Sequence, residues 1–248
     1  MLLTIDFGNT KIKTALFDED ILIKHKAFTS VDELIKHSAK TKHDAAAVSS
    51  VAPAKLEDFV SRYFSFFKKE PFVINNKLSF NLKINYDTPN TLGIDRICSS
   101  EGAFFLFKQS PAYSSYNNQT YFIVVDFGTA TTVEIISYPG VFEGGLILPG
   151  LNMMYKSLSK NTAQLPLINL EDYKNFIGKS THESIASGVL NAQAGIVDRA
   201  VNFVKELLEF PFISIYITGG VAKHILPFIQ HTYFYEPNLV LYGINQVY

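Results

Sequence analysis

Short apolar runs that end at polar turns dominate the first quarter of the chain. Residues 2–7 form one such run and lead into Asp6-Phe7-Gly8-Asn9-Thr10. Apolar residues then alternate with polar ones from Ile12 and resume over residues 21–23, with Asp18-Glu19-Asp20 between them. Alternation around a polar turn predicts a β-hairpin. Two further strands are predicted at residues 45–51 and 72–74.

Two helices are predicted in the same region. Ser30 is followed three residues later by Glu33, and this capping box starts a helix at about residue 31. Pro53 can open a second helix, because proline is tolerated in the first helical turn. Apolar side chains three or four residues apart follow it, which is the spacing of a face packed on a core. They are Phe59, Val60, Tyr63, Phe64 and Phe67.

The same kind of pattern restarts after residue 120. An apolar run over residues 121–125 leads into Asp126-Phe127-Gly128-Thr129. A long stretch with helical spacing covers residues 183–210. The remaining predicted elements of this half are strands at 132–136, 141–148, 213–217 and 239–242 and a helix at 221–230.

Two Asp-Phe-Gly turns therefore stand at matching places in two successive sets of elements. They lie 120 residues apart (126 minus 6), and each follows an apolar strand. This self-similarity indicates an internal repeat of a βββαβα unit. A spacing of 120 residues implies two lobes of about that length, which is the usual size of a domain. We predict an α/β protein with an N-terminal lobe over residues 1–115 and a C-terminal lobe over 116–248. Residues 109–120, rich in Ser, Tyr and Asn, are the predicted linker.

Composition narrows the class of protein. Hydrophobic residues make up 47% of the chain, enough for one large core or two modest ones. The net charge is −1, and the sequence lacks the basic stripe with which proteins bind a nucleic-acid backbone. Apolar runs stay well below the length of about 20 residues that spans a membrane, and the first residues do not resemble a secretory signal. Cys98 is the only cysteine, which fits a reducing compartment. We expect a cytoplasmic protein that binds neither nucleic acid nor membranes.

The repeated turn has the chemistry of an anion site. Gly8 lets backbone amides approach an anion because no side chain blocks the way, and successive amides in a tight turn form an anion-binding nest. Asn9 and Thr10 add side-chain donors, and the aspartate can hold a metal-bound water. A single Asp-x-Gly is most often a plain turn after a strand. Two copies, each followed by hydroxyl side chains, favour a pair of turns that bind a polyphosphate.

The chain lacks the P-loop and protein-kinase signatures. Its paired turns instead resemble the two phosphate motifs of the acetate-kinase, hexokinase and actin-like ATPase superfamily, which has a two-lobed, ribonuclease H-like fold. Within that superfamily the chain resembles the type III pantothenate kinases over nearly its whole length. Besides the two turns, the resemblance is carried by Leu92-Gly93-Ile94-Asp95-Arg96, Gly144-Gly145 to Pro149-Gly150, Thr162-Ala163-Gln164-Leu165-Pro166, Gly178-Lys179-Ser180-Thr181 and Thr218-Gly219-Gly220.

The resemblance implies roles for individual residues. Asp95 would be the general base, Asp126 would bind a monovalent cation, and Thr129 would contact ATP. The family usually has Ala where this chain has Ile94. The larger side chain would change the shape of the pantothenate pocket at that position. The other implied ATP contacts are Asp6, Phe7, Gly8, Asn9, Thr10, Lys11, Ile12 and Lys13. The implied substrate contacts are Tyr86, Gly93, Ile94, Asp95, Arg96 and Thr181.

Physical reasoning supports the Asp95 stretch independently. The apolar residues 97–107 have helical length, and Thr91 could cap that helix. Asp95 and Arg96 would then lie in the first turn, where free amides and the helix dipole favour anions. An arginine there can bind a carboxylate with two parallel hydrogen bonds. The simpler alternative is that Asp95 complements the helix dipole at the surface and Arg96 is only its neighbour.

The resemblance implies ATP-dependent phosphorylation of pantothenate to 4'-phosphopantothenate, the first step of coenzyme A biosynthesis. Mg²⁺ would arrive with ATP, and the monovalent cation would be K⁺ or NH₄⁺. Two alternatives are a superfamily kinase for another small alcohol and a catalytically silent regulatory accessory factor. The chain retains Asp6, Asp95 and Asp126, which favours an enzyme.

The resemblance also implies a homodimer. The predicted helix over residues 183–210 carries Gly188 and Gly195, seven residues apart, among apolar residues at helical spacing. This helix is the predicted interface, the alternative being that its apolar face packs within its own lobe. The apolar residues are Ile185, Val189, Ala192, Ile196, Ala200, Phe203, Val204 and Leu207.

Overall fold

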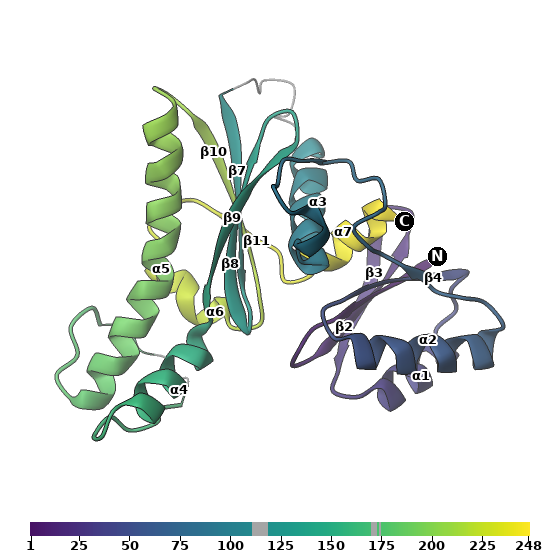
Figure 1. Ribbon diagram of the computed structural model, residues 1–248, viewed down its shortest axis with the longest axis horizontal. Coiled ribbons are helices and arrows are strands. Elements are labelled where there is room, and N and C mark those ends of the chain that lie inside the picture. Colours follow the sequence, from purple (N-terminus) through teal and green to yellow (C-terminus); the bar gives the residue numbers. More distant parts are fainter. Residues whose placement is uncertain (111–118, 170–172, 174) are drawn as a thin grey trace. The chain divides into compact units, whose positions relative to one another are not determined.

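The computed structural model describes residues 1–110, 119–169, 173 and 175–248, which form two compact units (Figure 1). Unit 1 comprises Met1–Ser114, Gly140–Phe142 and Asn238–Tyr248, and unit 2 comprises Ser115–Pro139 and Glu143–Pro237. The units are therefore not the two contiguous lobes expected from the sequence, because two later segments belong to unit 1. Most of the predicted linker, residues 109–120, lies outside the described residues.

Unit 1 is built on a five-stranded sheet with the order β3-β2-β1-β4-β5. Strand β1 pairs antiparallel with β2 and parallel with β4. The predicted hairpin is confirmed. The elements of unit 1 are β1 (Leu2–Phe7), β2 (Ile12–Asp18), β3 (Ile21–Phe28), α1 (Val31–Lys40), β4 (Ala45–Ser50), α2 (Pro53–Phe67), β5 (Phe72–Val73), β6 (Lys83–Ile84), η1 (Pro89–Thr91), α3 (Ile94–Lys108) and α7 (Leu239–Val247).

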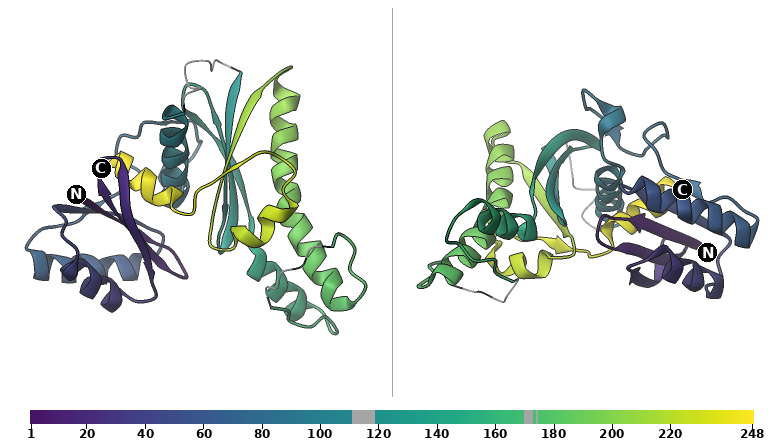
Figure 2. Two further views of the ribbon diagram at one scale, coloured as in Figure 1. Left: turned by 180° about the vertical axis from the view of Figure 1, so that it is seen from behind. Right: turned by 60° about the horizontal axis from the view of Figure 1, so that its bottom comes forward.

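Helices α1 and α2 cover one face of this sheet (Figures 1 and 2). The capping box is confirmed, since the Ser30 hydroxyl accepts a hydrogen bond from Glu33 N and α1 begins at the next residue. Every second residue of β1, from Leu3 to Phe7, points into the core beneath the two helices. Of the predicted α2 core residues, Phe59 and Tyr63 are buried, but Phe64 is 48% exposed.

Helices α3 and α7 pack together on the rest of unit 1. Residues 239–242 were predicted as a strand, and this was wrong: they form the start of α7. A Cβ on Gly243 would collide with the backbone of Cys98 in α3, so the close approach of the two helices requires glycine there. The helix predicted at 97–107 exists but starts at Ile94, and its N-cap is Gly93 rather than Thr91, which ends η1.

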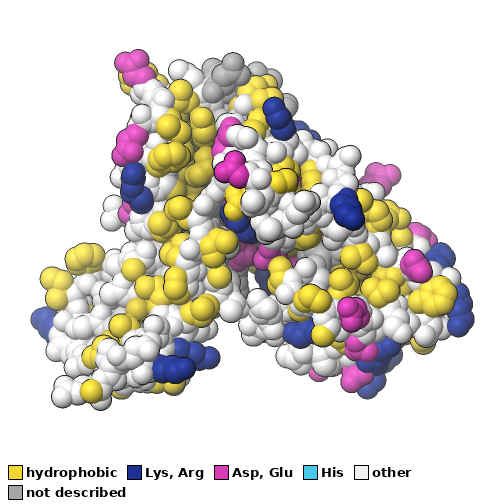
Figure 3. Space-filling view, viewed as in Figure 1, with side chains coloured by type: hydrophobic (Ala, Val, Ile, Leu, Met, Phe, Trp, Pro, Cys, Tyr) yellow, Lys and Arg dark blue, Asp and Glu magenta, His cyan; other side chains and the backbone are white. Residues whose placement is uncertain are grey.

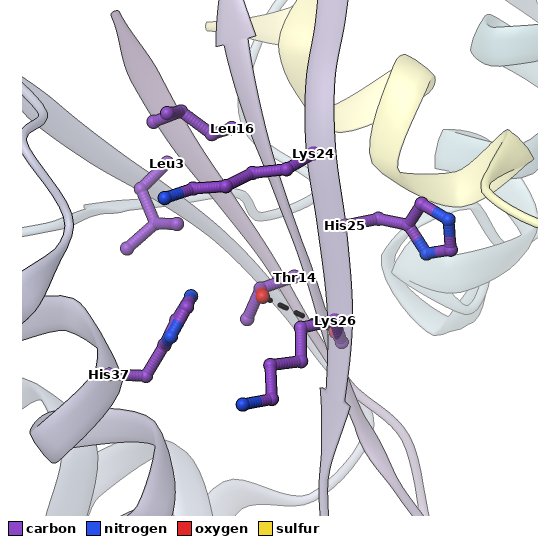
Figure 4. Close-up of a pocket in the computed structure, with 7 residues that line it drawn as sticks. All are labelled: Leu3, Thr14, Leu16, Lys24, His25, Lys26 and His37. Atoms are coloured by element: carbon purple, nitrogen blue, oxygen red, sulfur yellow. Dashed lines mark hydrogen bonds between the residues drawn. The ribbon is translucent and has the colours of Figure 1, made fainter.

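A small, open pocket lies beside the edge strand β3. Figure 4 shows Lys24, Lys26 and His37 on one side of β3 and His25 on the other. The Lys24 stem extends toward Leu3 and Leu16, and Lys26 lies beside Thr14. Both lysines are exposed, so their ammonium groups stay in water. Lysines on an edge strand discourage pairing with another chain, which accounts for this pocket without a ligand.

Unit 2 contains most of the second sheet, whose order is β11-β10-β7-β8-β9-β6. The last strand, β6, pairs with Val141 and Phe142, the first residues of β9, which belong to unit 1. The other elements are β7 (Thr120–Phe127), β8 (Ala130–Ser137), β9 (Val141–Pro149), α4 (Leu151–Asn161), α5 (Thr181–Leu207), β10 (Phe212–Thr218), α6 (Ala222–Ile225), η3 (Leu226–Phe228) and β11 (Phe234–Tyr235).

The long helix α5 runs along this sheet (Figures 1 and 2) and buries Val189, Val197 and Val204 against it. The predicted helix over 221–230 is wrong in length, because α6 stops at Ile225 and gives way to a 3-10 turn that contains Pro227. Helix α4 was not predicted. Figure 3 shows hydrophobic side chains gathered alongside α5. On α5 itself, Phe203 and Leu207 are exposed. Within the described part of the chain, none of the helices has the length and apolarity needed to cross a bilayer.

Candidate active site

The first Asp-Phe-Gly turn links β1 to β2 in unit 1. Asp6 is only 9% exposed, and its Oδ1 accepts a hydrogen bond of 2.8 Å from the Ser49 hydroxyl on the neighbouring strand β4. The Lys55 ammonium donates to the Asn9 carbonyl at 3.0 Å and ties the turn to α2. The buried carboxylate is therefore held in place by its sheet neighbour.

The eight predicted ATP contacts in and after the first turn, residues 6–13, differ in exposure. Asn9, Thr10 and Lys11 are exposed at the turn. Phe7 and Ile12 are fully buried in the core beneath α1 and α2. The side chains of these two residues anchor the turn, so any contact they make with a ligand is through the backbone.

Asp95 lies in the first turn of α3, as predicted. Its Oδ1 accepts a hydrogen bond of 2.9 Å from Arg96 N. Burial raises the pKa of the Asp95 carboxyl above its ordinary value, against the opposing effect of the Arg96 amide and charge. A carboxylate with a raised pKa is a stronger base than an exposed one, which suits it to accept a proton. Ile94 beside it is 9% exposed and faces inward.

Arg96 is enclosed by two aromatic rings. Its guanidinium carbon lies 5.8 Å from the ring centroid of Tyr86 and 5.8 Å from that of Phe142. The two rings meet edge to face, with centroids 6.1 Å apart. Arg96 is 6% exposed, so its side chain is buried rather than solvated. Such contacts hold a guanidinium in one orientation.

Phe142 was not singled out in the sequence. It reaches this cluster because β6, just before Tyr86, pairs with the start of β9. That pairing joins residues far apart in the chain, so no local pattern reveals it. The apolar pattern of β9 was visible, but it does not identify Arg96 as the partner of Phe142.

The first turn and the start of α3 share one electrostatic neighbourhood. Burial is the main cause of the raised pKa of the Cys98 thiol, and the charges of Asp6, Glu101 and Asp95 add to it. A buried thiol with a raised pKa stays protonated and unreactive, so Cys98 is a core residue. Two of the predicted site carboxylates in unit 1, Asp6 and Asp95, thus both act electrostatically on the Cys98 thiol.

The second Asp-Phe-Gly turn links β7 to β8 in unit 2. Backbone groups close it, with Gly128 N donating to Ala130 O at 3.1 Å and Gly150 N donating to Thr129 O at 3.2 Å. Gly219 has a φ of +112°, and a Cβ there would collide with the backbone of Phe127. The Gly-Gly motif after β10 is therefore part of the support of this turn, a role that its sequence alone did not indicate.

The remaining predicted site residues also belong to unit 2. Asp126 is half-buried at the end of β7, and Thr129 is exposed in the turn that follows. Thr181 is the first residue of α5 and is exposed, while the preceding Ser180 caps the helix. The structure thus brings Asp126 and Thr129 into one turn and places Thr181 on a different element.

Comparison with known proteins decides the family. A model of the type III pantothenate kinase family matches residues 2–202. The chain belongs to the type III pantothenate kinase family. A type III pantothenate kinase of Flavobacterium psychrophilum is 32% identical over 256 residues, covering 100% of this chain and 98% of the relative. One from Roseiflexus sp. is 32% identical over 264 residues, again covering 100% and 98%.

Solved structures place this type III pantothenate kinase family member in its fold class. A structure from Campylobacter jejuni, named for a Baf family transcriptional activator, has a TM-score of 0.62 and 21% identity over 99% of this chain and 96% of its own. A ROK hexokinase from Thermus thermophilus has a TM-score of 0.51 and 10% identity over 99% and 97%. At these identities the likeness concerns the fold alone, and it confirms the predicted two-lobed actin-like α/β fold.

Proposed function

We propose that this chain transfers the γ-phosphoryl group of ATP to the primary hydroxyl of pantothenate. Membership of the type III pantothenate kinase family supports the substrate. The observation that carries the proposal is the pair of neighbours at the start of α3. Asp95 is a partly buried carboxylate with a raised pKa, and Arg96 is an enclosed guanidinium. Pantothenate has a carboxylate at one end and a primary hydroxyl at the other, and these two side chains match them.

In this proposal Arg96 binds the pantothenate carboxylate and Tyr86 lines the same position. Asp95 orients the hydroxyl and takes its proton as the hydroxyl oxygen bonds to the γ-phosphorus. The bond between that phosphorus and the β,γ-bridging oxygen breaks, and ADP leaves with the bond's electron pair. Because phosphoryl transfer needs mainly alignment and charge neutralisation, few protein groups take part in bond making. Gly93, Ile94 and Thr181 complete the proposed substrate contacts.

The proposed ATP contacts are residues 6–13 of the first turn and Thr129 of the second. Exposed donors at Asn9, Thr10 and Lys11 support the first, and amides of such turns suit phosphate oxygens. Mg²⁺ would arrive with ATP, keep much of its water and neutralise phosphate charge. Such an ion needs no dense carboxylate cage, and no group of three or more His, Cys, Asp or Glu fit to hold a metal occurs among the described residues.

We assign a monovalent cation, K⁺ or NH₄⁺, to Asp126. Strand pairing supports the fit, because Asp126 lies in register with Thr132 on β8 and Thr218 on β10. Side chains in register share a face of a sheet, so three oxygen-bearing side chains form a row there. The Thr218 hydroxyl is buried and lacks a hydrogen-bond partner in the described structure. Oxygen ligands are the ones that hard cations prefer.

Release of ADP, followed in a coupled assay, tests the function. We expect turnover with pantothenate and little with pantoate or glycerol. If Arg96 binds the carboxylate, pantothenol, which has a hydroxymethyl group in place of the carboxylate, should be a poor substrate. A rate with glycerol equal to that with pantothenate would assign the chain to another small alcohol. A cytoplasmic location would follow from this metabolic role.

We also propose a homodimer through α5. The apolar set of this helix divides between two faces. Gly188, Ala192 and Gly195 are exposed and form a row of small residues on the outer face, and a Cβ on either glycine would meet nothing within 4 Å. The other face packs within unit 2, as the alternative reading expected, and includes Ile185, Val189, Ala200 and Val204.

Gly195→Glu tests this interface. The glutamate fits the free chain without a clash and enters a two-fold interface twice. We expect monomers by light scattering, an intact fold and weaker pantothenate binding. The matched control is Lys205→Glu, which places a glutamate in the last turn of the same helix and reverses the charge there. A fully active wild-type monomer at micromolar concentration would refute the dimer, and a Gly195→Glu dimer would refute only this choice of helix.

A further inference from the structure

Glu101 is a buried carboxylate on α3 for which the proposed chemistry has no use. It is 1% exposed. Its Oε1 accepts a hydrogen bond of 2.8 Å from Leu82 N, and its Oε2 accepts one of 3.0 Å from Asn81 Nδ2. Burial raises the pKa of Glu101, and these two bonds oppose the rise. A buried carboxylate costs stability compared with an apolar residue of similar size, so its presence calls for a reason beyond packing.

The residues that Glu101 holds lead directly to the aromatic enclosure of Arg96. Asn81 and Leu82 precede β6, whose first residue donates from Lys83 N to Gly140 O at 2.9 Å. Two residues beyond Lys83, Asn85 N donates to Phe142 O at 3.0 Å. Tyr86 comes next. The carboxylate therefore fixes the start of the segment that places Tyr86 beside Phe142.

A side-chain amide fixes the far end of the same segment. Asn76 Nδ2 donates to Leu92 O at 2.8 Å and to Pro89 O at 2.6 Å. Between residues 74 and 93 the only regular elements are the two residues of β6 and the three of η1. With so little secondary structure, a few side-chain bonds determine where Tyr86 lies.

Helix α3 thus supplies both the guanidinium and the group that holds its aromatic partner. Glu101 lies five residues after Arg96 (101 minus 96) on the same helix. A helix is stiff over that distance, so the position of Tyr86 is set relative to Arg96 through a single rigid element. Loss of the Glu101 bonds would leave Arg96 in place and release only the ring.

We propose that Glu101 is a positioning residue for substrate binding: by fixing residues 81 and 82 to α3, it holds Tyr86 against Arg96 and so sets the affinity for pantothenate. This inference rests on the proposed roles of Tyr86 and Arg96. Glu101 itself touches neither the substrate nor the reacting atoms.

The test compares Glu101→Gln and Asn81→Ala with the wild type. We expect the KM for pantothenate to rise about ten- to a hundredfold, since small displacements of a binding group are costly, with kcat and the KM for ATP changed by less than about threefold. Hydrogen exchange should show faster exchange at Leu82 to Tyr86. Asn81 is exposed, so Asn81→Ala gives an answer even if a Glu101 variant does not fold.

Glu33→Gln is the matched control. Glu33 also accepts one backbone N–H and one side-chain donor, both from Thr29, but at the start of α1. The Glu33→Gln variant should leave the KM for pantothenate unchanged. In the double variant Glu101→Gln/Asn81→Asp the side chain at 101 becomes the donor and the side chain at 81 becomes the acceptor of their hydrogen bond. This variant should recover most of the lost affinity for pantothenate. If the single variants acted only by disturbing the packing, the second substitution would not restore that affinity.

Two results would overturn the inference. One is a lower Tm or faster exchange in Glu101→Gln and Asn81→Ala with an unchanged KM for pantothenate, which would make Glu101 purely structural. The other is an unchanged exchange rate at Leu82 to Tyr86. Tyr86→Ala, measured alongside, separates the two proposals: if it leaves the KM unchanged, the assigned role of Tyr86 is wrong, and exchange alone judges the anchoring by Glu101.

Discussion

The two Asp-Phe-Gly turns occupy the same place in their sheets but differ in what surrounds the aspartate. Each follows a strand with an antiparallel neighbour on one side and a parallel neighbour on the other. Asp6 is in register with Lys13 and Ser49, and Asp126 with Thr132 and Thr218. The first turn therefore has a built-in cation where the second has a hydroxyl.

The hydroxyl on the parallel neighbour differs as well. Ser49 donates to Asp6, whereas the buried Thr218 hydroxyl has no hydrogen-bond partner in the described structure. The two copies of the motif therefore share the same strand pairing but differ in the charge of the side chains in register with the aspartate. The first copy has a lysine, Lys13, in register with its aspartate, and in our proposal the second copy instead offers oxygen atoms to a cation from solution.

The largest effect is expected from the catalytic group that only unit 1 contributes in our proposal. Asp95→Asn should fold normally and lose about 10²- to 10⁴-fold in kcat, the usual cost of removing a general base. Steady-state kinetics with pantothenate measure this. Retention of more than about half of the wild-type kcat would show that the base assignment is wrong.

The next largest effect concerns stimulation by a monovalent cation, which should depend on the aspartate of the second turn and not on that of the first. Asp126→Ala should lose the stimulation by K⁺ or NH₄⁺, and its rate in K⁺ should drop about 10²-fold, since a fixed charge near the transferring phosphoryl group has about that value. Asp6→Ala should be slower in every buffer yet keep its ratio of rates with and without K⁺. Titration calorimetry with K⁺ provides a second readout. Equal rates of the wild type in Na⁺ and K⁺ buffers, free of ammonium, would disprove the cation site.

A substitution that copies the first turn into the second gives a smaller effect. Thr132→Lys places an ammonium group at the position equivalent to Lys13. We expect its rate in K⁺-free buffer to rise about tenfold above that of the wild type, because the lysine replaces part of the cation's charge, and its calorimetric K⁺ binding to disappear. Thr132→Met, of similar length and no charge, should remain dependent on K⁺. If Thr132→Lys still needs K⁺, the two register positions are not equivalent.

The smallest expected effect concerns stability. Burial raises the folded-state pKa of Asp95, so the folded protein binds this proton more tightly than the unfolded chain does. The carboxylate therefore destabilises the fold once the pH exceeds that raised pKa, and the penalty disappears below the ordinary pKa of aspartate. Asp95→Asn should raise the Tm near neutral pH, and the gain should shrink as the pH falls.

Asp32 provides the control of opposite sign. Its pKa is lowered by its hydrogen bond and ion pair with Arg62, so Asp32→Asn should lower the Tm near neutral pH if it has any effect. A Tm of Asp95→Asn below that of the wild type at neutral pH would mean that the Asp95 carboxylate contributes more to the fold through its bond to Arg96 N than it costs through burial.

Local signals in the sequence predicted the parts of the fold that local physics determines. The hairpin around Glu19, the capping box at Ser30 and the helix opened by Pro53 all depend on residues a few positions apart. The run Leu-Val-Leu-Tyr at 239–242 was misjudged because a short apolar run suits a buried strand or a buried helix. Packing against α3, a non-local contact, decides in favour of the helix.

In the candidate site, too, the sequence predicted the residues that belong to local motifs and missed those that depend on distant contacts. Motifs placed Asp6, Asp95 and Asp126 at strand ends or in the first turn of a helix, and the structure has them there. Phe142 and Glu101 were not found, because their importance depends on which distant segment each one contacts. A phenylalanine on a strand and a glutamate in a helix are ordinary residues until β6 brings the segment before Tyr86 beside both of them.

The helix α7 has a consequence for how the protein is made. Unit 1 is interrupted after Ser114 and resumes its main body at Asn238, 124 positions later (238 minus 114). A ribosome therefore produces all of unit 2 before it produces the helix that packs on α3. Until then the face of α3 that receives Gly243 stays uncovered, and the same helix carries Asp95 and Arg96 at its start. Synthesis order thus delays completion of unit 1, which carries the proposed substrate contacts, until both Asp-Phe-Gly turns already exist.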